Sequence, residues 1–405
     1  MGDAVGRRPA FLLSVVVIAV FGLLSAVANN YGTLLAIRVV VGMGIGGLTI
    51  PFDTMAEYLP QTQRGTALLS LSYFWTFGIL LVVLSAYVAQ QNFRLLLVLC
   101  AIPCILSTLV AAWFVPESPR WLLAKGRSAQ ALDTLRRAAH VNGHPDAVSL
   151  FPLGMKLKAE EPEVKSFAVI CSPQWGKLFF FLSIVWAGFG LLYYATIMLV
   201  TDIFAQDPAE RGEADGEGVD IDYEAITMSV VSEFVGLTVV MFTIDRFGRV
   251  ASQVFTYFSG GICVLLLCLF ASADSTSRNL LVVLAFGSRL FMSTGSCVTW
   301  THTAEVLTTE IRTTGHSFVN SMARVTGVIS PFIVQGGLPY RTIGVILFIA
   351  SILTTIASFC LPETRGIALG TAMSQDSTTA KERTGTPNSQ EMSQSPATVS
   401  DKEVV

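Results

Sequence analysis

The residues Asp3-Ala4-Val5-Gly6-Arg7-Arg8-Pro9 form a polar motif that directly precedes a long apolar run. A second version of the motif, Asp245-Arg246-Phe247-Gly248-Arg249, begins 242 residues later and again precedes an apolar run. In both copies a glycine, which permits a tight turn, separates an aspartate from an arginine. The recurrence suggests that the chain contains two related halves.

The composition is typical of a membrane protein. Of the 405 residues, 52% are hydrophobic and 14% are charged, whereas soluble domains carry about 25% charged residues. The apolar residues gather in runs of the length that a helix needs to cross about 30 Å of hydrocarbon. We therefore predict an all-α polytopic membrane protein with about ten transmembrane helices, at 10–28, 33–51, 65–89, 95–115, 178–201, 225–244, 250–273, 280–304, 315–338 and 342–362.

The first of these runs has an alternative interpretation. Arg7 and Arg8 before it, and Ala26-Val27-Ala28 at its end, also fit a secretory signal peptide. The run is long for a signal peptide, and the repeat assigns it to a transmembrane helix, so we favour the helix.

Basic residues distinguish the two ends of the predicted spans. One end carries most of the arginines and the basic 118–177 segment, which the positive-inside rule places in the cytosol. An even number of spans then places both termini in the cytosol. The predicted regions are an incomplete N-terminal bundle (1–116), a cytosolic linker with a short amphipathic helix capped by Ser128 (117–177), a C-terminal six-helix bundle (178–365) and a disordered cytosolic tail (366–405).

Three further landmarks repeat in the same order as the motif. Arg38 corresponds to Arg289, and all the offsets between paired landmarks fall between 242 and 251 residues. The other two pairs are Ala56-Glu57-x6-Arg64 with Ala304-Glu305-x6-Arg312, and Pro116-Glu117-Ser118 with Pro362-Glu363-Thr364. Four collinear matches predict two homologous halves, as in transporters built from parallel repeats.

The repeat also predicts an asymmetry between the halves. Two spans, 178–201 and 225–244, precede the second motif, whereas none precedes Asp3. By internal symmetry, we expect that two helices are missing from the N-terminal half.

These landmarks resemble the major facilitator superfamily. The Asp-x-x-Gly-Arg-Arg motif, the Glu-x6-Arg pairs, Arg38-x3-Gly42-x-Gly44-x-Gly46-Gly47 and the segment 116–123 together are similar to its sugar-porter and organic-ion-transporter branch. More narrowly, residues 56–60, 232–234, 245–249 and 322–325 resemble the synaptic vesicle 2-related (SVOP-like) proteins. The resemblance covers roughly residues 1–366 and departs at Ala4, where a basic residue is usual.

The resemblance implies a fold of twelve helices, of which this chain would contain helices three to twelve. It also implies an intracellular vesicle as the location of this integral, multi-pass membrane protein, with the plasma membrane as an alternative.

Charged residues at the predicted cytosolic helix ends suggest a gate. Contacts between carboxylates and guanidinium groups would hold that side shut and release when it opens, and the resemblance implies the same role. The alternative is ordinary surface ion pairs, each worth about 0–1 kcal/mol. The predicted gate residues are Asp3, Arg7, Glu57, Arg64, Glu117, Asp245, Arg249, Glu305, Arg312 and Glu363.

Three charged residues lie in the middle of predicted spans. A lone charge there costs at least about 2.5–3.5 kcal/mol, so such residues usually face a cavity or one another. Glu233 is a candidate for binding a proton or a cationic group, with a structural ion pair to an arginine as the alternative. Arg324 is a candidate for contacting a substrate carboxylate or phosphate, whereas Arg289 is interpreted as structural.

Two further polar positions carry weaker predictions. Asp53 and Glu57 lie four residues apart on one helix face, and form either a proton-linked carboxylate pair or a hydrogen-bonded helix end. His302, near the end of its span, is interpreted as an interfacial histidine whose hydrogen bonds are satisfied.

Aromatic residues in the 178–201 span form another candidate site. Tyr193 and Tyr194, with Trp186, line an aromatic cavity or pack in the core.

No enzyme motif is present in the sequence. There is no Walker A loop, His-Glu-x-x-His or Gly-x-Ser-x-Gly, and we expect no enzymatic activity, cofactor or metal site. We predict a transmembrane transporter that moves a small organic solute, an organic ion or a sugar-like molecule, by alternating access. Arginine outnumbers acid at mid-depth, which favours anionic or zwitterionic substrates.

Two questions about this function stay open at this point. Proton coupling is one. The other is whether the chain is instead a non-transporting vesicle-membrane binding or regulatory protein, or a truncated inactive transporter. The expected partners are membrane lipid, a small organic solute and, where coupling exists, protons; we expect a monomer and no nucleic acid.

Overall fold

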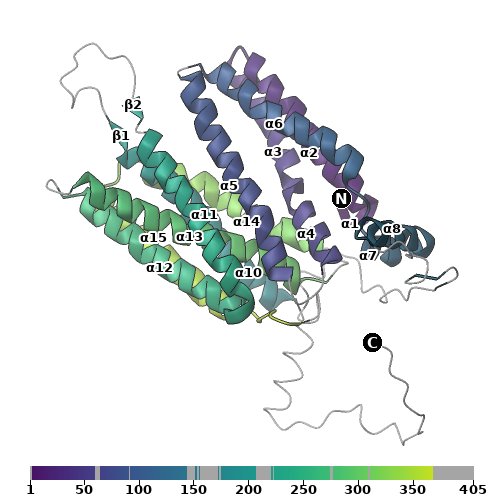
Figure 1. Ribbon diagram of the computed structural model, residues 1–405. Helices are drawn as coiled ribbons and strands as arrows, with labels where there is room; N and C mark the ends of the chain where they lie inside the picture. Colours follow the sequence, from purple (N-terminus) through teal and green to yellow (C-terminus); the bar gives the residue numbers. More distant parts are fainter. Residues whose placement is uncertain are drawn as a thin grey trace, which may run out of the picture.

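The structure, a computed structural model, describes residues 2–59, 64–90, 92–143, 151–152, 155, 172, 175–206, 220–221, 223–273, 277–308 and 311–367. Within these residues, ten helices are long and apolar enough to cross a membrane, which confirms the predicted number (Figure 1). Residues 207–219, most of residues 144–174 of the predicted linker and residues 368–405 of the predicted tail lie outside the described part.

The first half of the chain contributes four spans. They are formed by α2 (Arg7–Leu24), by α3 (Tyr31–Ile45) continuing into α4 (Thr49–Tyr58), by α5 (Arg64–Ala89) and by α6 (Phe93–Phe114); α1 (Gly2–Val5) precedes them. The helix α2 packs against both α3 and α6, as a transmembrane helix of a bundle does.

The second span is longer than predicted and is interrupted. Between α3 and α4 lies the 3-10 turn η2 (Gly46–Leu48), so the helical path runs to Tyr58 rather than ending at residue 51. Pro51 has no backbone N–H to give to a continuous α-helix, and it lies in the first turn of α4, where none is required. Gly47 lets this turn lie directly against Ser14 of α2, because a Cβ atom at residue 47 would overlap the Ser14 hydroxyl. In α4, which follows the break, Asp53 and Glu57 are buried.

The second half contributes six spans. They are α10 (Gly176–Ile203), α11 (Tyr223–Phe247), α12 (Arg249–Ala271), α13 (Arg278–Val306), α14 (Arg312–Val334) and α15 (Tyr340–Phe359). In Figure 1 the helices α12 and α15 lie on the far side of the molecule from α2 and α6, and α5 lies beside α11, its main contact with the second half.

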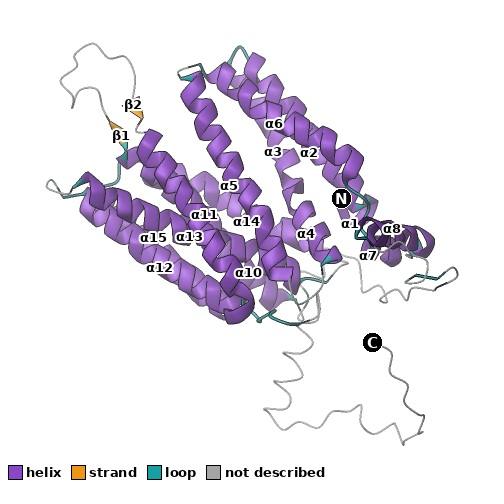
Figure 2. Cartoon of the chain, viewed as in Figure 1, coloured by secondary structure: helices purple, strands orange, loops and turns teal. Residues whose placement is uncertain are grey.

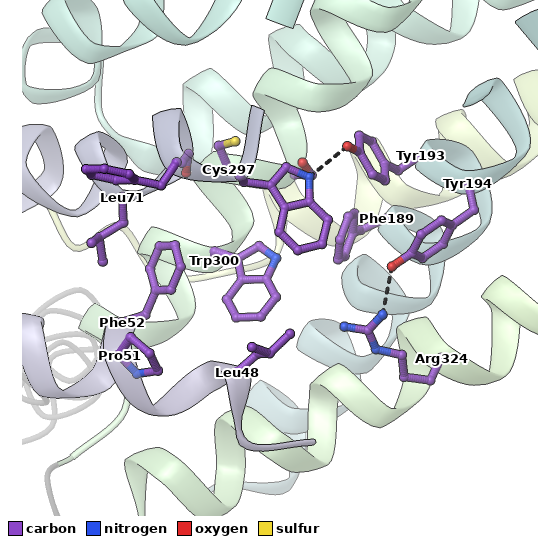
Figure 3. A pocket seen from close by; sticks show the side chains of 14 residues that line it. Leu48, Pro51, Phe52, Leu71, Phe189, Tyr193, Tyr194, Cys297, Trp300 and Arg324 are labelled. Atoms are coloured by element: carbon purple, nitrogen blue, oxygen red, sulfur yellow. Dashed lines mark hydrogen bonds between the residues drawn. The ribbon is translucent and has the colours of Figure 1, made fainter. Parts of the chain in front are cut away.

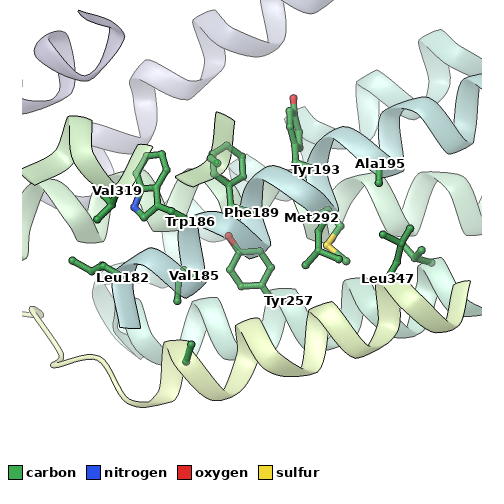
Figure 4. Close-up of a cluster of buried hydrophobic side chains, with 14 of the residues drawn as sticks. Leu182, Val185, Trp186, Phe189, Tyr193, Ala195, Tyr257, Met292, Val319 and Leu347 are labelled. Carbon is green, nitrogen blue, oxygen red and sulfur yellow. The ribbon is translucent and has the colours of Figure 1, made fainter. Parts of the chain in front are cut away.

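The helix α10 forms the centre of the second half. It packs against α13, α14 and α15, and Leu182, Val185 and Trp186 along it are fully buried (Figure 4). Close packing depends on two glycines: a Cβ atom at Gly188 would overlap Thr354 of α15, and one at Gly190 would overlap the Ala323 backbone of α14. Lipid tails are as apolar as these side chains, so the close packing of the helices, rather than removal of side chains from water, stabilises this half.

Two short helices and a small sheet complete the described structure (Figure 2). The helix α7 (Pro119–Ala124) is capped by the Ser118 side chain, and α8 (Ser128–Val141) is the predicted amphipathic helix. Ser128 is not its cap: it is the first helical residue, and Arg127 occupies the cap position without a side-chain hydrogen bond. The strands β1 (Ala205–Gln206) and β2 (Asp220–Ile221) pair antiparallel.

The two repeated motifs form the same turn. Gly6 and Gly248 have positive φ angles of 132° and 92°, and each is followed directly by the arginine that begins the next transmembrane helix. Residues other than glycine rarely adopt such φ angles. The motif therefore positions Arg7 and Arg249 at equivalent points of the two halves.

Candidate functional site

Charged side chains gather in one layer at one end of the helices. This charged layer consists of Arg7, Glu57, Glu117, Asp245, Arg249, Glu305, Arg312 and Glu363. It contains eight of the ten predicted gate residues. The side chains of the other two, Asp3 and Arg64, lie outside the described part.

In the first half, the charged layer is centred on Glu57. Its Oε1 accepts hydrogen bonds from Arg7 Nη2 at 3.0 Å and from Arg312 Nη1 at 3.0 Å, and its Oε2 accepts one from the Ser118 hydroxyl. Both arginine side chains and the carboxylate are buried. The Ser118 hydroxyl also accepts a hydrogen bond from the backbone N–H of Trp121, so the cap of α7 holds the carboxylate in place.

In the second half, the corresponding carboxylate is Glu305. Arg249 donates to both of its oxygens, from Nε at 2.7 Å and from Nη2 at 2.8 Å, and Thr364 donates to Oε2 at 2.7 Å. Thr364 and Ser118 are equivalent in the repeat, as are Arg249 and Arg7. The difference is that Glu57 also binds an arginine of the other half.

Two further carboxylates hold the turns of the motif. Glu117 accepts from the backbone N–H of Arg7 at 2.8 Å, and Glu363 accepts from those of Arg249 at 2.9 Å and Val250 at 3.0 Å. Burial by itself would raise the pKa of the Glu363 carboxyl, but hydrogen bonds from backbone N–H groups, together with the nearby His302, lower it below the usual value.

Arg312 has partners in both halves. Besides Glu57, its guanidinium donates to the backbone carbonyls of Ala304 at 2.9 Å and Leu307 at 2.8 Å, at the end of α13. The arginine is thus fixed within its own half and reaches across to the other.

Side chains of α4 and α14 meet in a row of three contacts between the halves. They are Glu57 with Arg312, Asp53 Oδ1 with His316 Nδ1 at 2.8 Å, and the hydroxyls of Thr49 and Ser317 at 3.2 Å. We call this row the α4–α14 contact. It joins the two halves at the end of the molecule that carries the charged layer.

An aromatic cavity of about 380 Å³ lies between the halves (Figure 3). Leu48 to Phe52 and residues of α5 form one side, and residues of α10, α13 and α14 form the other. Among the described residues that line it, Arg324 is the one with a charged side chain. The lining residues are Leu48, Pro51, Phe52, Leu71, Ser72, Phe74, Trp75, Phe189, Tyr193, Tyr194, Ser296, Cys297, Trp300 and Arg324.

Hydrogen bonds orient two tyrosines in this cavity (Figure 3). Arg324 Nη1 donates to the Tyr194 hydroxyl at 2.7 Å, and Trp75 Nε1 donates to the Tyr193 hydroxyl at 2.9 Å. Tyr193, Tyr194 and Arg324, predicted from the sequence, thus lie together, whereas Trp186 packs in the core of the second half. Their role in binding stays a prediction.

Glu233 lies outside the lining of the cavity, in a buried ion pair. Its Oε1 accepts from Arg289 Nη2 at 2.7 Å and Nε at 3.1 Å, and its Oε2 accepts from the Thr76 hydroxyl at 3.4 Å. This geometry matches the alternative interpretation of Glu233, a structural ion pair. A role in binding a proton or substrate stays a prediction.

Residues that the sequence reasoning missed complete the site. Phe52, Trp75 and Trp300 line the cavity, and His316 contacts Asp53. A signal for His316 was present, because it lies four residues after Arg312 and so shares its helix face. His302, the histidine named in the sequence analysis, has its Nε2 2.8 Å from the Pro362 carbonyl oxygen, to which it donates a hydrogen bond.

Two related helix groups, a cavity between them and a charged layer at one end define a membrane transporter of the major facilitator superfamily. The chain belongs to the family described as "Sugar (and other) transporter", whose family model matches residues 1–373. The resemblance predicted from the motifs is therefore confirmed.

Known proteins similar to this chain agree with this assignment. The synaptic vesicle 2-related protein of Xenopus laevis is 32% identical over 389 residues, which is 91% of this chain and 68% of the relative. The organic cation/carnitine transporter 7 of Arabidopsis thaliana is 29% identical over 405 residues, which is 89% of this chain and 79% of the relative. Among solved structures, the proton:xylose symporter XylE bound to 6-bromo-6-deoxy-D-glucose matches 92% of this chain and 84% of its own, with 18% identity and a TM-score of 0.68.

Proposed function

We propose that this protein carries a small organic anion with an aromatic or otherwise planar body across a membrane by alternating access of its two halves. The observation that carries the proposal is the position of Arg324, which is the charged residue in an aromatic cavity lined by both halves. A cavity of about 380 Å³ falls in the size range of small-molecule sites, which is roughly 300–1,000 Å³.

The charges around the cavity favour an anion. Glu233 is already neutralised by Arg289, so its carboxylate has no charge to offer a cation. Arg324 is held by a neutral tyrosine hydroxyl, and among the described residues no carboxylate forms an ion pair with it. Arg324 is half-buried, and such a guanidinium is stabilised by a carboxylate, sulfonate or phosphate, which it can bind through two parallel hydrogen bonds.

The aromatic walls favour a planar apolar body. Phe52, Phe189 and Trp300 present ring surfaces to the cavity, and stacking between such rings and a planar solute contributes about 0.5–1.5 kcal/mol per pair beyond area burial. A sugar-like solute would require several polar partners in place of these rings.

The charged layer supports the alternating-access part of the proposal. The α4–α14 contact joins the halves at one end of the cavity, and it consists of hydrogen bonds that separate when the helices move apart. The basic residues at this end support its placement in the cytosol. The similarity to the synaptic vesicle 2-related protein of Xenopus laevis supports an intracellular vesicle as the location, with the plasma membrane as the alternative.

Uptake into liposomes tests this function. The purified full chain is reconstituted, and uptake of radiolabelled benzoate and naphthalene sulfonate is compared with that of tetraethylammonium and glucose. We expect uptake of the anions, reduced at least tenfold by Arg324→Ala and unchanged by Arg341→Ala, an exposed arginine at the start of α15. Absence of anion uptake, or equal uptake by Arg324→Ala, would overturn the proposal.

A further inference from the structure

Asp53 and His316 form a buried pair between the two halves. Both side chains are completely buried, and Asp53 Oδ1 lies 2.8 Å from His316 Nδ1. Within the described part of the chain, Asp53 Oδ2 and His316 Nε2 have no hydrogen-bond partner. Buried polar atoms nearly always have one, so two unsatisfied atoms on one pair require an explanation.

The pair lies next to the wall of the aromatic cavity. Trp300 lines the cavity and has its ring 5.2 Å from the His316 ring, and Trp186 contacts the same imidazole at 5.3 Å. Phe52 precedes Asp53 in α4 and packs on Trp300 at 5.1 Å, as Figure 3 shows from the cavity side. The solute site and the pair are thus separated by one layer of aromatic rings.

The shared hydrogen bond already holds one proton. With that proton between Nδ1 and Oδ1, His316 Nε2 has a free lone pair and Asp53 Oδ2 is a free acceptor. Either atom can therefore take a second proton without breaking an existing hydrogen bond.

The surrounding charges balance when His316 is neutral. Three guanidinium groups, of Arg7, Arg120 and Arg312, lie near three carboxylates, of Asp53, Glu57 and Glu117. Among the other described ionisable side chains of the packed helices, Glu305 is held by Arg249, His302 by the Pro362 carbonyl and Arg324 by Tyr194, and Lys177 is exposed. One additional proton gives these six described groups a net positive charge around Asp53, Glu57, Arg7 and Arg312, which are buried.

We propose that the Asp53–His316 pair is a proton-binding site, and that proton uptake there releases α4 from α14. A net charge is costly in a buried cluster, whereas water at an opened interface stabilises it. The closed arrangement therefore prefers the pair without the added proton, and the opened arrangement prefers the pair with it. The linkage is reciprocal: protons favour opening, and opening favours proton binding.

The consequence for transport rests on the proposed function above. A proton that reaches the Asp53–His316 pair from the cavity loosens the α4–α14 contact, which closes the end of the molecule that carries the charged layer. Solute and proton then both leave at that end. The proton-binding site itself does not depend on the identity of any solute.

Tryptophan fluorescence tests proton binding directly. A protonated imidazole quenches a neighbouring indole more strongly than a neutral one, and Trp186 and Trp300 both contact His316. In the purified full chain, we expect fluorescence to fall reversibly as the pH is lowered, because the pair takes up a proton. His316→Gln should abolish this change, and the matched control His302→Gln should retain it.

A second variant covers the case in which His316→Gln fails to fold. Asp53→Asn keeps the imidazole but removes the carboxylate that shares its proton, so the fluorescence change with pH should differ from that of the unmodified chain. A titration identical to that of the unmodified chain in either variant would overturn the proposal.

Distances between the halves test the release. Spin labels are placed at Phe114→Cys of α6 and Phe247→Cys of α11, both exposed and both near the charged layer, in a background whose reactive cysteines are replaced by serine. We expect acid to increase the longer-distance population, and His316→Gln to make the distribution independent of pH. If the distance distribution of the labelled chain that keeps Asp53 and His316 does not change with pH, the release step is overturned.

These outcomes separate the two proposals. Neither readout uses a transported solute, so an intact titration without anion uptake would reject the proposed function and leave the proton site standing. Anion uptake without the fluorescence titration would reject the proton site and leave the proposed function standing.

Discussion

Glu57 of α4 and Arg312 of α14 form an ion pair of 3.0 Å between the two halves, with both side chains fully buried. Breaking a buried pair by removing one partner is strongly destabilising, because it leaves an uncompensated charge. Here the same carboxylate also balances Arg7, so two guanidinium groups depend on it.

Glu57→Gln should therefore destabilise the closed arrangement by about 3–5 kcal/mol. We expect a lower thermal unfolding temperature in detergent and a shift of the spin-label distances toward the open population. The matched control is Glu224→Gln, because the exposed Glu224–Arg278 pair at 4.0 Å should contribute about 0–1 kcal/mol. Equal effects of the two substitutions would contradict the buried-pair argument.

Tyr194→Phe should weaken anion binding through Arg324. The tyrosine hydroxyl accepts the Arg324 hydrogen bond at 2.7 Å and fixes the guanidinium against the cavity. Loss of one such hydrogen bond costs about 0.5–1.5 kcal/mol, which corresponds to roughly a two- to tenfold rise in the KM for benzoate. Tyr73→Phe is the control, since that hydroxyl bonds Thr238 outside the cavity lining. An unchanged KM in Tyr194→Phe would argue against this positioning role.

A double-mutant cycle can decide what Glu233 does. Glu233→Gln or Arg289→Met alone should each cost about 3–5 kcal/mol, because each leaves the other charge buried and unpaired. The double substitution should recover most of this stability, as measured by thermal unfolding. If the double variant also transports benzoate, Glu233 is structural. If it folds but does not transport, the predicted functional role is supported.

Glu363 should make the free energy of unfolding depend on pH in the acidic range. Its pKa is lower in the folded protein than in the unfolded chain, so its contribution is fully present above the ordinary carboxyl pKa of about 4.3 and is lost as pH falls through the folded-state value. The unmodified chain should therefore lose stability below about pH 4 more steeply than Glu363→Gln. Thermal unfolding at a series of pH values measures this, and parallel curves would refute it.

Much of the fold followed from local patterns. Apolar runs predicted ten spans, and the glycines of the repeated motif predicted the turns that the positive φ angles of Gly6 and Gly248 show. The break before α4 was missed, because Pro51 and the preceding glycines lie within a run whose average hydropathy is high.

The site was harder to predict, because its contacts join residues far apart in the sequence. The Glu-x6-Arg spacing drew attention to Glu57 and Arg312 separately, but it could not show that they bind each other across 255 residues. His316 was missed because its position on the helix face of Arg312 could not show that its partner, Asp53, lies 263 residues away in the sequence. The burial that makes it interesting comes from Asp53, Trp186 and Trp300 on three other helices.

The carbonyls of Ala304 and Leu307 give Arg312 a second set of acceptors. When the halves part, the guanidinium keeps these two bonds, and Glu57 keeps Arg7 and the Ser118 hydroxyl. Neither charged group therefore loses all its partners when the halves separate. The Glu57–Arg312 ion pair can break and re-form many times without leaving an unpaired charge.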